Sequence, residues 1–478
     1  MAKKRIRQSH RNVNKKVSSY SEHSSLCALA PIISEKEIFE PIHKSVQIPQ
    51  KTVIYRPTDK LVFVTLGIVS GSETVYDLNQ NLRVDQPLLQ AFGYERCADQ
   101  SVIQETLNAA TAENVEQLEV ALKNIWDRNN LTTSLLKDAK IEGKLVTIDI
   151  DLSGQPTSKN AQQSTKGYFA GKKNVYLRQL ARVLVPDTQE IVAESLYPGN
   201  TLSCSVFKAM VRKMEQLLPL ENKAQRSLIR IRLDAGFGTD ANINFALWRG
   251  YHLLAKIYSG KRAKLLAKSV QEWVDVPSNA LGAPRQAGWV SKPHRYGRKT
   301  KQVAVRTPKK KGGYTYTVLV TTEFSADIQT IVTDYDKRSG VPESNFCQDN
   351  QGLSNRKRRK RGFIAQKMLT LLTQLAHNLI RWFQNWMISA VKQHAEDNVT
   401  GDSFSDEKDT ALVVKTLKER GMKRFVRQIL SISGKVVMKG KRIISIILNP
   451  LYPLINRIKT AFSALLNNYG ITVSLGKS

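Results

Sequence analysis

The sequence predicts an α/β fold in which a helical region precedes a core of alternating strands and helices. Residues 144–152 (KLVTIDIDL) alternate in polarity and are rich in β-branched residues, which is typical of a strand. Residues 100–126 instead carry apolar residues at helical spacing. With 478 residues and 41% hydrophobic content, the chain is long enough for two to four domains with a sizeable core.

The predicted core occupies residues 141–258 and resumes at residues 334–400. Its first part is expected to run through three strands, a helix, a strand, a helix and a last strand. These segments are 144–152, 175–185 and 190–197 (strands), 205–218 (helix), 227–234 (strand), 240–250 (helix) and 251–258 (strand). The turn PDTQ predicts that the second and third strands pair antiparallel. In the second part, the apolar stripe of residues 363–391 predicts a core-packing helix.

Four further regions surround this core. Residues 1–50 begin MAKKRIRQSHRNVNKK and are expected to form a flexible basic arm. Residues 51–140 predict a helical domain that binds DNA or serves as a packing layer. Residues 259–333 predict a β-rich basic insertion, with strands on both sides of the turn KKKGG. Residues 401–478 predict a polar linker at 402–410 and then a small basic region with two strands inside 425–448.

The charge of the chain predicts a polyanionic partner. The formal net charge is +32, from 73 basic and 41 acidic residues. The excess is concentrated, because residues 260–313 hold 14 Lys and Arg against two acids, and residues 411–478 hold 13 against one. Such clusters suit contacts with phosphates, each of which makes binding to duplex DNA more salt-sensitive, by a log–log slope of about −0.9.

Several other classes of protein are not supported by the sequence. The four cysteines form no C-x-x-C pair, which argues against a zinc ribbon or a disulfide scaffold and fits a reducing compartment. The apolar stretch after the basic N-terminus is short and broken at Pro31, which makes a poor signal peptide, and no window approaches the ~18 apolar residues that a membrane helix needs. A Walker loop and a G-x-S-x-G elbow are also absent, and His377 has no second His at ligand spacing.

Three acidic segments stand in order along the chain: TIDIDLSG at 147–154, RLDAGFGTD at 232–240 and YDKRSGVPE at 335–343. Each places an acid where a strand ends or a helix begins. Carboxylates that converge from different elements can hold two divalent metal ions, and hard Mg²⁺ or Mn²⁺ prefers their oxygen ligands. The segments therefore predict a two-metal centre for phosphodiester cleavage.

The residues around each acid support its role as a metal ligand to different degrees. Asp151 precedes Leu152 and Ser153 and is the preferred first acid, with Asp149 on the same strand face as its rival. The glycines that follow Asp234 allow a tight turn and close approach to a ligand. Glu343 follows Pro342, which predicts a helix start. Taken alone, each acid has another reading: Asp151 and Asp234 as turn residues, and Glu343 as a helix-dipole partner.

The chain resembles bacterial insertion-sequence DDE transposases, whose RNase-H-like core carries a β-rich insertion before the last acid. The strand and helix order given above is that of such a core. The last signature of these enzymes reads Tyr, two residues, Arg, three residues, Glu, six residues, Lys. Here Tyr335 and Arg338 fit, Glu343 lies one residue late, and Asn350 stands at the place of the Lys.

The resemblance implies that Asp151, Asp234 and Glu343 ligate two Mg²⁺ or Mn²⁺ ions, while Tyr335 and Arg338 hold the DNA end. It also implies that the insertion contacts DNA. Trp289 is a candidate for stacking on a base, although packing is the commoner role of such a residue. The basic candidates of the insertion are Arg295, Arg298, Lys299, Lys309, Lys310 and Lys311.

The sequence thus leads to the hypothesis of a transposase that cuts and joins DNA at terminal inverted repeats. Its partners would be the double-stranded transposon ends and target DNA, bound by a homodimer in a bacterial cytoplasm in association with the nucleoid, without a membrane. The irregular last signature leaves a non-catalytic DNA-binding remnant as an alternative. A nuclease on the same RNase-H-like core is the other alternative.

Overall fold

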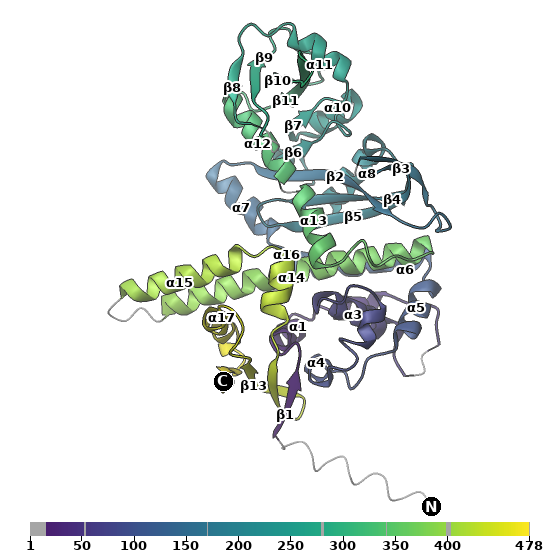
Figure 1. The fold of residues 1–478 in the computed structure, drawn as a ribbon, viewed down its shortest axis with the longest axis vertical. Coiled ribbons are helices and arrows are strands. Elements are labelled where there is room, and N and C mark those ends of the chain that lie inside the picture. The colour runs from purple at the N-terminus through teal and green to yellow at the C-terminus, as the bar shows by residue number, and fades with distance from the viewer. Residues whose placement is uncertain are drawn as a thin grey trace, which may run out of the picture. The chain divides into compact units, whose positions relative to one another are not determined.

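The computed structural model describes residues 16–51, 54–169, 171–278, 282–340, 342–397 and 403–477. The chain divides into two compact units, one made of residues 1–129 with 348–478 and the other of residues 130–347 (Figure 1). Both mix helices with a β-sheet. Within the described residues, no helix is both long and apolar enough to cross a membrane.

The unit of residues 130–347 contains the first part of the predicted core, residues 141–258, and only residues 334–347 of its second part, because residues 348–400 belong to the other unit. Its helices are α7 (Thr132–Glu142), α8 (Ser203–Leu217), α9 (Lys223–Arg226), α10 (Asp240–Arg249), α11 (Gly260–Ala267), α12 (Ile328–Gly340) and the start of α13 (Pro342–Gly352). Its strands are β2 (Val146–Pro156), β3 (Thr165–Phe169), β4 (Lys172–Val185), β5 (Glu190–Pro198), β6 (Ile229–Leu233), β7 (His252–Lys256), β8 (Val274–Val276), β9 (Arg285–Trp289), β10 (Lys301–Pro308) and β11 (Tyr314–Thr321). All seven segments predicted for residues 141–258 are therefore present.

One sheet runs through this unit in the order β3-β4-β2-β6-β7-β11-β10-β9-β8, and β5 pairs with β4. The predicted antiparallel pairing of β4 with β5 is confirmed. Strand β2 is parallel to β6, with Ile150 opposite Leu233, and β6 is parallel to β7, with Leu233 opposite Ala255. The carboxyl ends of these three parallel strands therefore meet at one edge of the sheet, the usual place for a site in an open α/β sheet.

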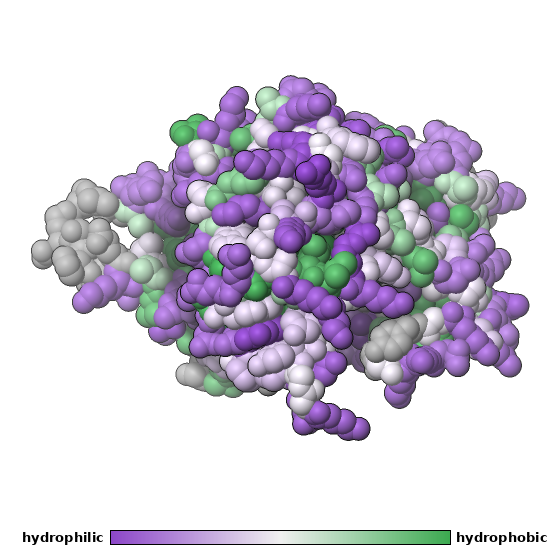
Figure 2. Space-filling view, turned by 90° about the horizontal axis from the view of Figure 1, so that it is seen from above, coloured by the Kyte–Doolittle hydropathy of each residue, from purple (hydrophilic) through white to green (hydrophobic). Residues whose placement is uncertain are grey.

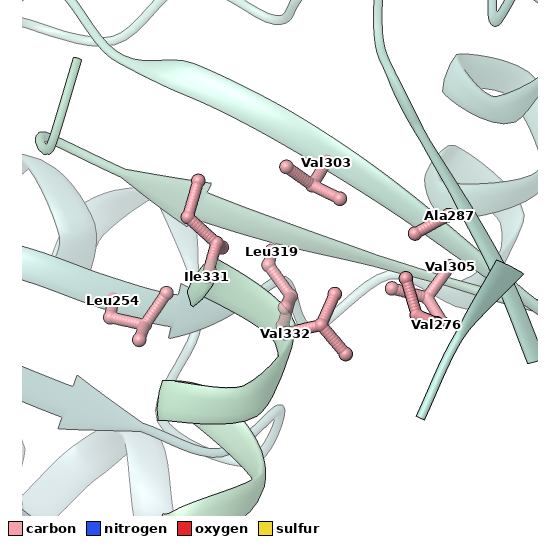
Figure 3. Packing of buried hydrophobic residues seen from close by; sticks show 8 residues of the cluster. All are labelled: Leu254, Val276, Ala287, Val303, Val305, Leu319, Ile331 and Val332. Atoms are coloured by element: carbon pink, nitrogen blue, oxygen red, sulfur yellow. The ribbon is translucent and has the colours of Figure 1, made fainter. Parts of the chain in front are cut away.

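The strands predicted around KKKGG exist as β10 and β11, but they belong to the same sheet as the core. Strand β11 pairs antiparallel with the edge of β7 that faces away from β6. This edge of β7 is therefore not left open. Helix α12 covers this extension (Figure 3). The buried residues of the packing are Leu254, Val276, Ala287, Val303, Val305, Leu319, Ile331 and Val332. This packing connects α12, which carries two predicted site residues, to the sheet.

The other unit is a helical assembly with a small sheet. Its helices are α1 (Leu29–Glu35), α2 (Glu40–Ser45), α3 (Pro57–Val69), α4 (Gln86–Ala91), α5 (Gln100–Ala109), α6 (Ala112–Asn129), α14 (Phe363–Asp397), α15 (Ser403–Lys418), α16 (Met422–Phe425) and α17 (Ile455–Asn467), with short η1 (Leu26–Ala28), η2 (Tyr76–Asn79) and η3 (Val426–Leu430). Strands β1 (Lys16–Ser21), β12 (Gly434–Lys439), β13 (Arg442–Leu448) and β14 (Thr472–Leu475) form the sheet, in that order. The predicted helices of 51–140 and 363–391 and the two strands within 425–448 are present. Helix α14, however, was expected to pack in the predicted core, and it belongs to this unit instead.

The structure corrects two predictions for this unit. Residues 16–50, expected in a flexible arm, form β1 and two helices, because β1 pairs with β12 and the apolar residues 26–33 are mostly buried. Residues 1–15 lie outside the described residues. The polar segment 402–410 was expected to be a linker, but its residues from 403 onward belong to α15, while residue 402 is not described.

Candidate active site

Asp149 is buried and held by an arginine from the neighbouring strand. It lies on β2 opposite Arg232 of β6, and only 1% of the residue is exposed. Arg232 donates two hydrogen bonds to the carboxylate, from Nε to Oδ1 and from Nη2 to Oδ2, both at 2.7 Å. Burial raises the pKa of Asp149, and the arginine opposes this shift. Both oxygens of Asp149 are thus engaged in a bidentate ion pair inside the sheet.

Asp151 lies two residues further on the same strand and has different partners. Its Oδ1 accepts a hydrogen bond from the Leu152 backbone N–H at 2.9 Å and lies 3.1 Å from Nη2 of Arg338. Burial raises the pKa of Asp151 to about 6, the Asp234 and Asp149 charges add to the rise, and the Arg338 charge opposes it. A carboxyl that is destabilised by burial and by a second carboxylate favours a bound cation or proton.

Asp234 follows the last residue of β6 and begins a tight turn. Its Oδ1 accepts a hydrogen bond from the Phe237 N–H at 3.2 Å, and its carbonyl accepts one from the Gly238 N–H at 3.1 Å. A Cβ at Gly238 would lie 1.8 Å from the carbonyl oxygen of Lys256, so only glycine allows the turn to pass β7 this closely. The tight turn that the sequence predicts after Asp234 is therefore present, and Gly238 is required for it.

The strand register places Asp151 and Asp234 side by side. Ile150 is opposite Leu233, so the next residue on each chain is Asp151 on β2 and Asp234 after β6. Neighbouring strands are about 4.8 Å apart. The negative charge of Asp234 raises the pKa of Asp151, which agrees with this proximity. The predicted first and second acids thus meet at the carboxyl edge of the parallel strands.

Helix α12 adds Arg338 and Tyr335 to the same site. Arg338 is 8% exposed, and two of its buried nitrogens, Nε and Nη2, have no hydrogen-bond partner among the described residues, despite the ion pair with Asp151. The charges of Asp151 and Asp234 raise the pKa of this guanidinium against the effect of its burial. Tyr335 is half-buried against the core cluster, and burial raises its pKa, with Asp234 and Asp151 adding to the rise.

Glu343 is the second residue of α13, so it stands near a helix start as the sequence predicts. Its side chain lies outside the described part of the structure. Among the described residues, no three His, Cys, Asp or Glu side chains come together as a metal-binding group. The described part of the site therefore contains two acids, Asp151 and Asp234, and the place of Glu343 in it stays a prediction.

The residues predicted to contact DNA through the insertion lie on several of its elements. Trp289 on β9 is separated from β6 by three strands, it packs against the core cluster, and Lys301 Nζ lies 3.9 Å from its ring centroid. Arg298 is exposed and donates from Nη1 to the Leu247 carbonyl at 3.1 Å. The remaining predicted contacts, Arg295, Lys299, Lys309, Lys310 and Lys311, are all exposed.

Exposed basic side chains suit contact with a polyanion. Figure 2 shows hydrophilic residues over most of one face of the molecule.

Sequence reasoning missed three basic residues around the acids. Arg232 pairs with Asp149 and also donates to the Asp334 carbonyl of α12 at 2.6 Å. Arg230 bonds Thr147, Glu323 and Asp334, which links β2, β6 and α12. Lys256, the last residue of β7, is half-buried, and burial lowers its pKa while Asp234 opposes the shift. A charged residue in an otherwise apolar strand was the available signal for all three.

The raised pKa of Asp151 predicts that metal-free protein is more stable at lower pH. The folded state binds the proton below about pH 6 and the unfolded state below about pH 4, so stability falls as pH rises between these values. The size is about 3 kcal/mol for a two-unit shift. In thermal unfolding with chelator, Asp151→Asn is expected to flatten this dependence between pH 4 and 7, whereas Asp187→Asn, in the exposed β4–β5 turn, keeps it. An equal slope in wild type and Asp151→Asn would contradict the prediction.

Fold and site together define a mixed α/β protein with an acidic centre at the carboxyl edge of parallel strands. The family model described as Transposase DDE domain group 1 matches residues 12–399, and the chain belongs to this family. The family implies an enzyme that cleaves and transfers DNA. The chain is also similar to the piggyBac transposase in a cryo-EM synaptic complex with hairpin DNA, at 13% identity over 86% of this chain and 85% of that chain, with a TM-score of 0.43. No curated protein matches the chain in sequence.

Proposed function

We propose that this chain is an active transposase that binds terminal inverted repeats, hydrolyses one DNA strand at the element boundary and joins the freed 3′ hydroxyl to target DNA. The observation that carries the proposal is the pairing of Asp151 with Asp234 at the carboxyl edge of β2 and β6, beside Arg338. Family membership supplies the reaction class. The site supplies acids and a buried guanidinium at one place.

An RNase-H-like arrangement of the core is part of this proposal. The support is the sheet order β5-β4-β2-β6-β7, in which the first three strands are antiparallel neighbours and β6 and β7 then continue parallel to β2. This matches the order of three strands, helix, strand, helix and strand expected for such a core. We further propose that β8 to β11 are the insertion of the family resemblance, joined to the core sheet through β7.

We infer that Asp151, Asp234 and Glu343 hold two Mg²⁺ or Mn²⁺ ions. The donor set fits, because Asp151 and Asp234 offer hard oxygen ligands and the proximity of their charges disfavours two bare carboxylates. We leave Asp149 out of this ligand set, because both of its carboxylate oxygens accept hydrogen bonds from Arg232. When bound, the ions would supply an activated water and charge stabilisation at the leaving oxygen.

Arg338 and Tyr335 are proposed to position the DNA end at these acids. The buried Nε and Nη2 of Arg338 lack hydrogen-bond acceptors among the described residues, and a phosphate oxygen would supply them. Arg232 and Arg230 bond Asp334 and so fix α12 against the strands that carry the acids. These contacts hold Arg338 in place before DNA binds, which reduces the ordering that the reaction requires.

The partner of the proposed reaction is double-stranded DNA, both the element ends and the target. The net charge of +32 supports this partner, because a basic protein attracts the phosphate backbone at any sequence. We propose that a homodimer pairs two ends, and that the protein acts on the nucleoid in the cytoplasm of a bacterium that carries the insertion sequence.

The test is a cleavage assay with purified full-length protein and duplex DNA that carries the inverted repeats flanking the gene. We expect Mg²⁺-dependent nicks at the element boundary, joining of the 3′ ends to a target plasmid, and loss of both products in EDTA. Salt-dependent binding without metal-dependent cleavage would instead identify a non-catalytic remnant. Cutting that ignores the repeats and yields no joined product would identify a nuclease.

A further inference from the structure

A row of three charged residues crosses the carboxyl edge of the parallel strands. Leu233 is opposite both Ile150 on β2 and Ala255 on β7, so the next residues on the three chains, Asp151, Asp234 and Lys256, stand at one level. In register, neighbouring residues of parallel strands point to the same face of a sheet. Asp234 therefore has Asp151 on one side and Lys256 on the other.

The backbone around Lys256 is fixed by the turn that follows Asp234. The turn passes so close to β7 that Gly238 has no room for a side chain beside the Lys256 carbonyl. The Tyr258 N–H donates to the Gly238 carbonyl at 2.9 Å, which joins the turn to the chain after β7. On its other edge, Lys256 pairs with Leu319 of β11. The position of Lys256 relative to Asp234 is thus set by paired backbone on both sides.

The ammonium group of Lys256 has no partner within the described residues. It makes neither a hydrogen bond nor an ion pair there, although it is half-buried and stands next to Asp234. Asp151 is paired with Arg338, Asp149 with Arg232, and Asp336 with Arg285. Asp234 stands next to Lys256 without forming an ion pair with it, so the donors of this half-buried ammonium stay available to an anion from outside the protein.

We propose that Lys256 binds a non-bridging oxygen of the DNA phosphate that is cleaved at Asp151 and Asp234. The inference rests on the proposed function and adds a residue to its site. A phosphate oxygen held at the acids would lie beside this ammonium, whose donors no described residue uses. A compact, hydrated ammonium suits this contact as a point charge, and the charge that develops on the phosphate oxygens strengthens it.

The test compares Lys256→Met and Lys256→Arg in the full-length protein, with the inverted-repeat duplex as DNA probe. Lys256→Met is expected to lower the single-turnover nicking rate by about 10²-fold, as expected for the loss of one preorganised charge-stabilising donor. The salt slope of DNA binding should fall by about 0.9. Lys256→Arg keeps the charge and should recover at least tenfold of the lost rate. Binding of Mn²⁺ alone should be unchanged or tighter, because a neighbouring cation has been removed.

The matched control is Lys213→Met, since Lys213 of α8 is also half-buried in this unit but donates to the Glu194 carbonyl and the Ser195 hydroxyl. Its nicking rate should stay within about threefold of the parent. Parent-like nicking by Lys256→Met would overturn the inference while leaving the proposed function intact. The inference would also be overturned if Lys256→Met lost Mn²⁺ binding to the same extent as its nicking rate. Lys256 would then hold the acids in place and would not bind the phosphate. If the parent itself fails to nick, the proposed function fails first.

A second measurement needs no variant. In EDTA, where DNA binds without being cut, acylation of wild-type lysines is followed by mass spectrometry with and without the duplex. Lys256 should be protected at least fivefold by DNA that spans the element boundary. It should be unprotected by DNA that ends before the boundary. Equal labelling of Lys256 in the presence of both duplexes would contradict a phosphate contact at the cleaved position.

Discussion

Asp234→Asn is expected to abolish Mg²⁺-dependent nicking, by at least ~10³-fold, and to leave binding to the element ends within about threefold of the parent. The carboxylate leads the turn that the Phe237 N–H and Gly238 brace, and it stands next to Asp151 across β2 and β6. An amide is a far weaker ligand for a hard cation, and metal charge stabilisation contributes several kcal/mol to such reactions. DNA binding depends on basic residues that the substitution does not touch.

Asp240→Asn is the matched control for this experiment. Asp240 lies six residues after Asp234 at the start of α10, but it is 40% exposed and pairs with Arg262 and His294. Its nicking rate should stay within about threefold of the parent. Parent-like nicking by Asp234→Asn would show that the metal assignment is wrong. Loss of end binding together with nicking would instead indicate that the variant has lost its fold, which a melting curve checks.

The sequence predicted the elements of the core because each is a local pattern. The alternating segment 144–152 forms β2, and the mostly apolar segment before Asp234 forms β6. A period of two also places Asp149 and Asp151 on the same face, so the pattern alone could not separate them. Their difference lies in their neighbours: Arg232 stands opposite Asp149, whereas Asp151 stands beside Asp234 and Arg338.

Contacts between distant segments explain what the sequence did not predict. The short apolar run at 26–33 shows no clear period, and it is buried because residues near 432 complete its surroundings: the Ser25 N–H and the Ser24 hydroxyl both donate to the Ile432 carbonyl. Lys256 was missed for the same reason, since its place beside Asp234 follows from the parallel pairing of β6 and β7. Strand order is a property of the whole chain, and local periodicity contains no information on it.

The second large effect concerns stability, and it follows from the buried pair of Asp149 and Arg232. Asp149→Ala is expected to destabilise the unit of residues 130–347 by about 3–5 kcal/mol, because Arg232 stays buried with its charge unpaired. For a unit of this size, this corresponds to a Tm lower by about 10 °C. Differential scanning calorimetry at pH 7 in chelator measures the shift. Glu142→Gln is the control, since Glu142 and Lys144 form an exposed pair and removal of its charge should cost less than about 1 kcal/mol.

A double variant separates a structural role of Asp149 from a ligand role. Asp149→Leu with Arg232→Met replaces both charges by apolar side chains, which should restore most of the lost stability, because replacing a complete buried pair is often nearly neutral. If Asp149 is structural, the folded double variant still binds Mn²⁺ through Asp151 and Asp234. If Asp149 were the first ligand, Mn²⁺ binding would be lost although the fold has recovered. Arg232 also donates to the Asp334 carbonyl, so the double variant holds α12 less firmly. We therefore expect its nicking rate to fall about tenfold while its affinity for Mn²⁺ is unchanged.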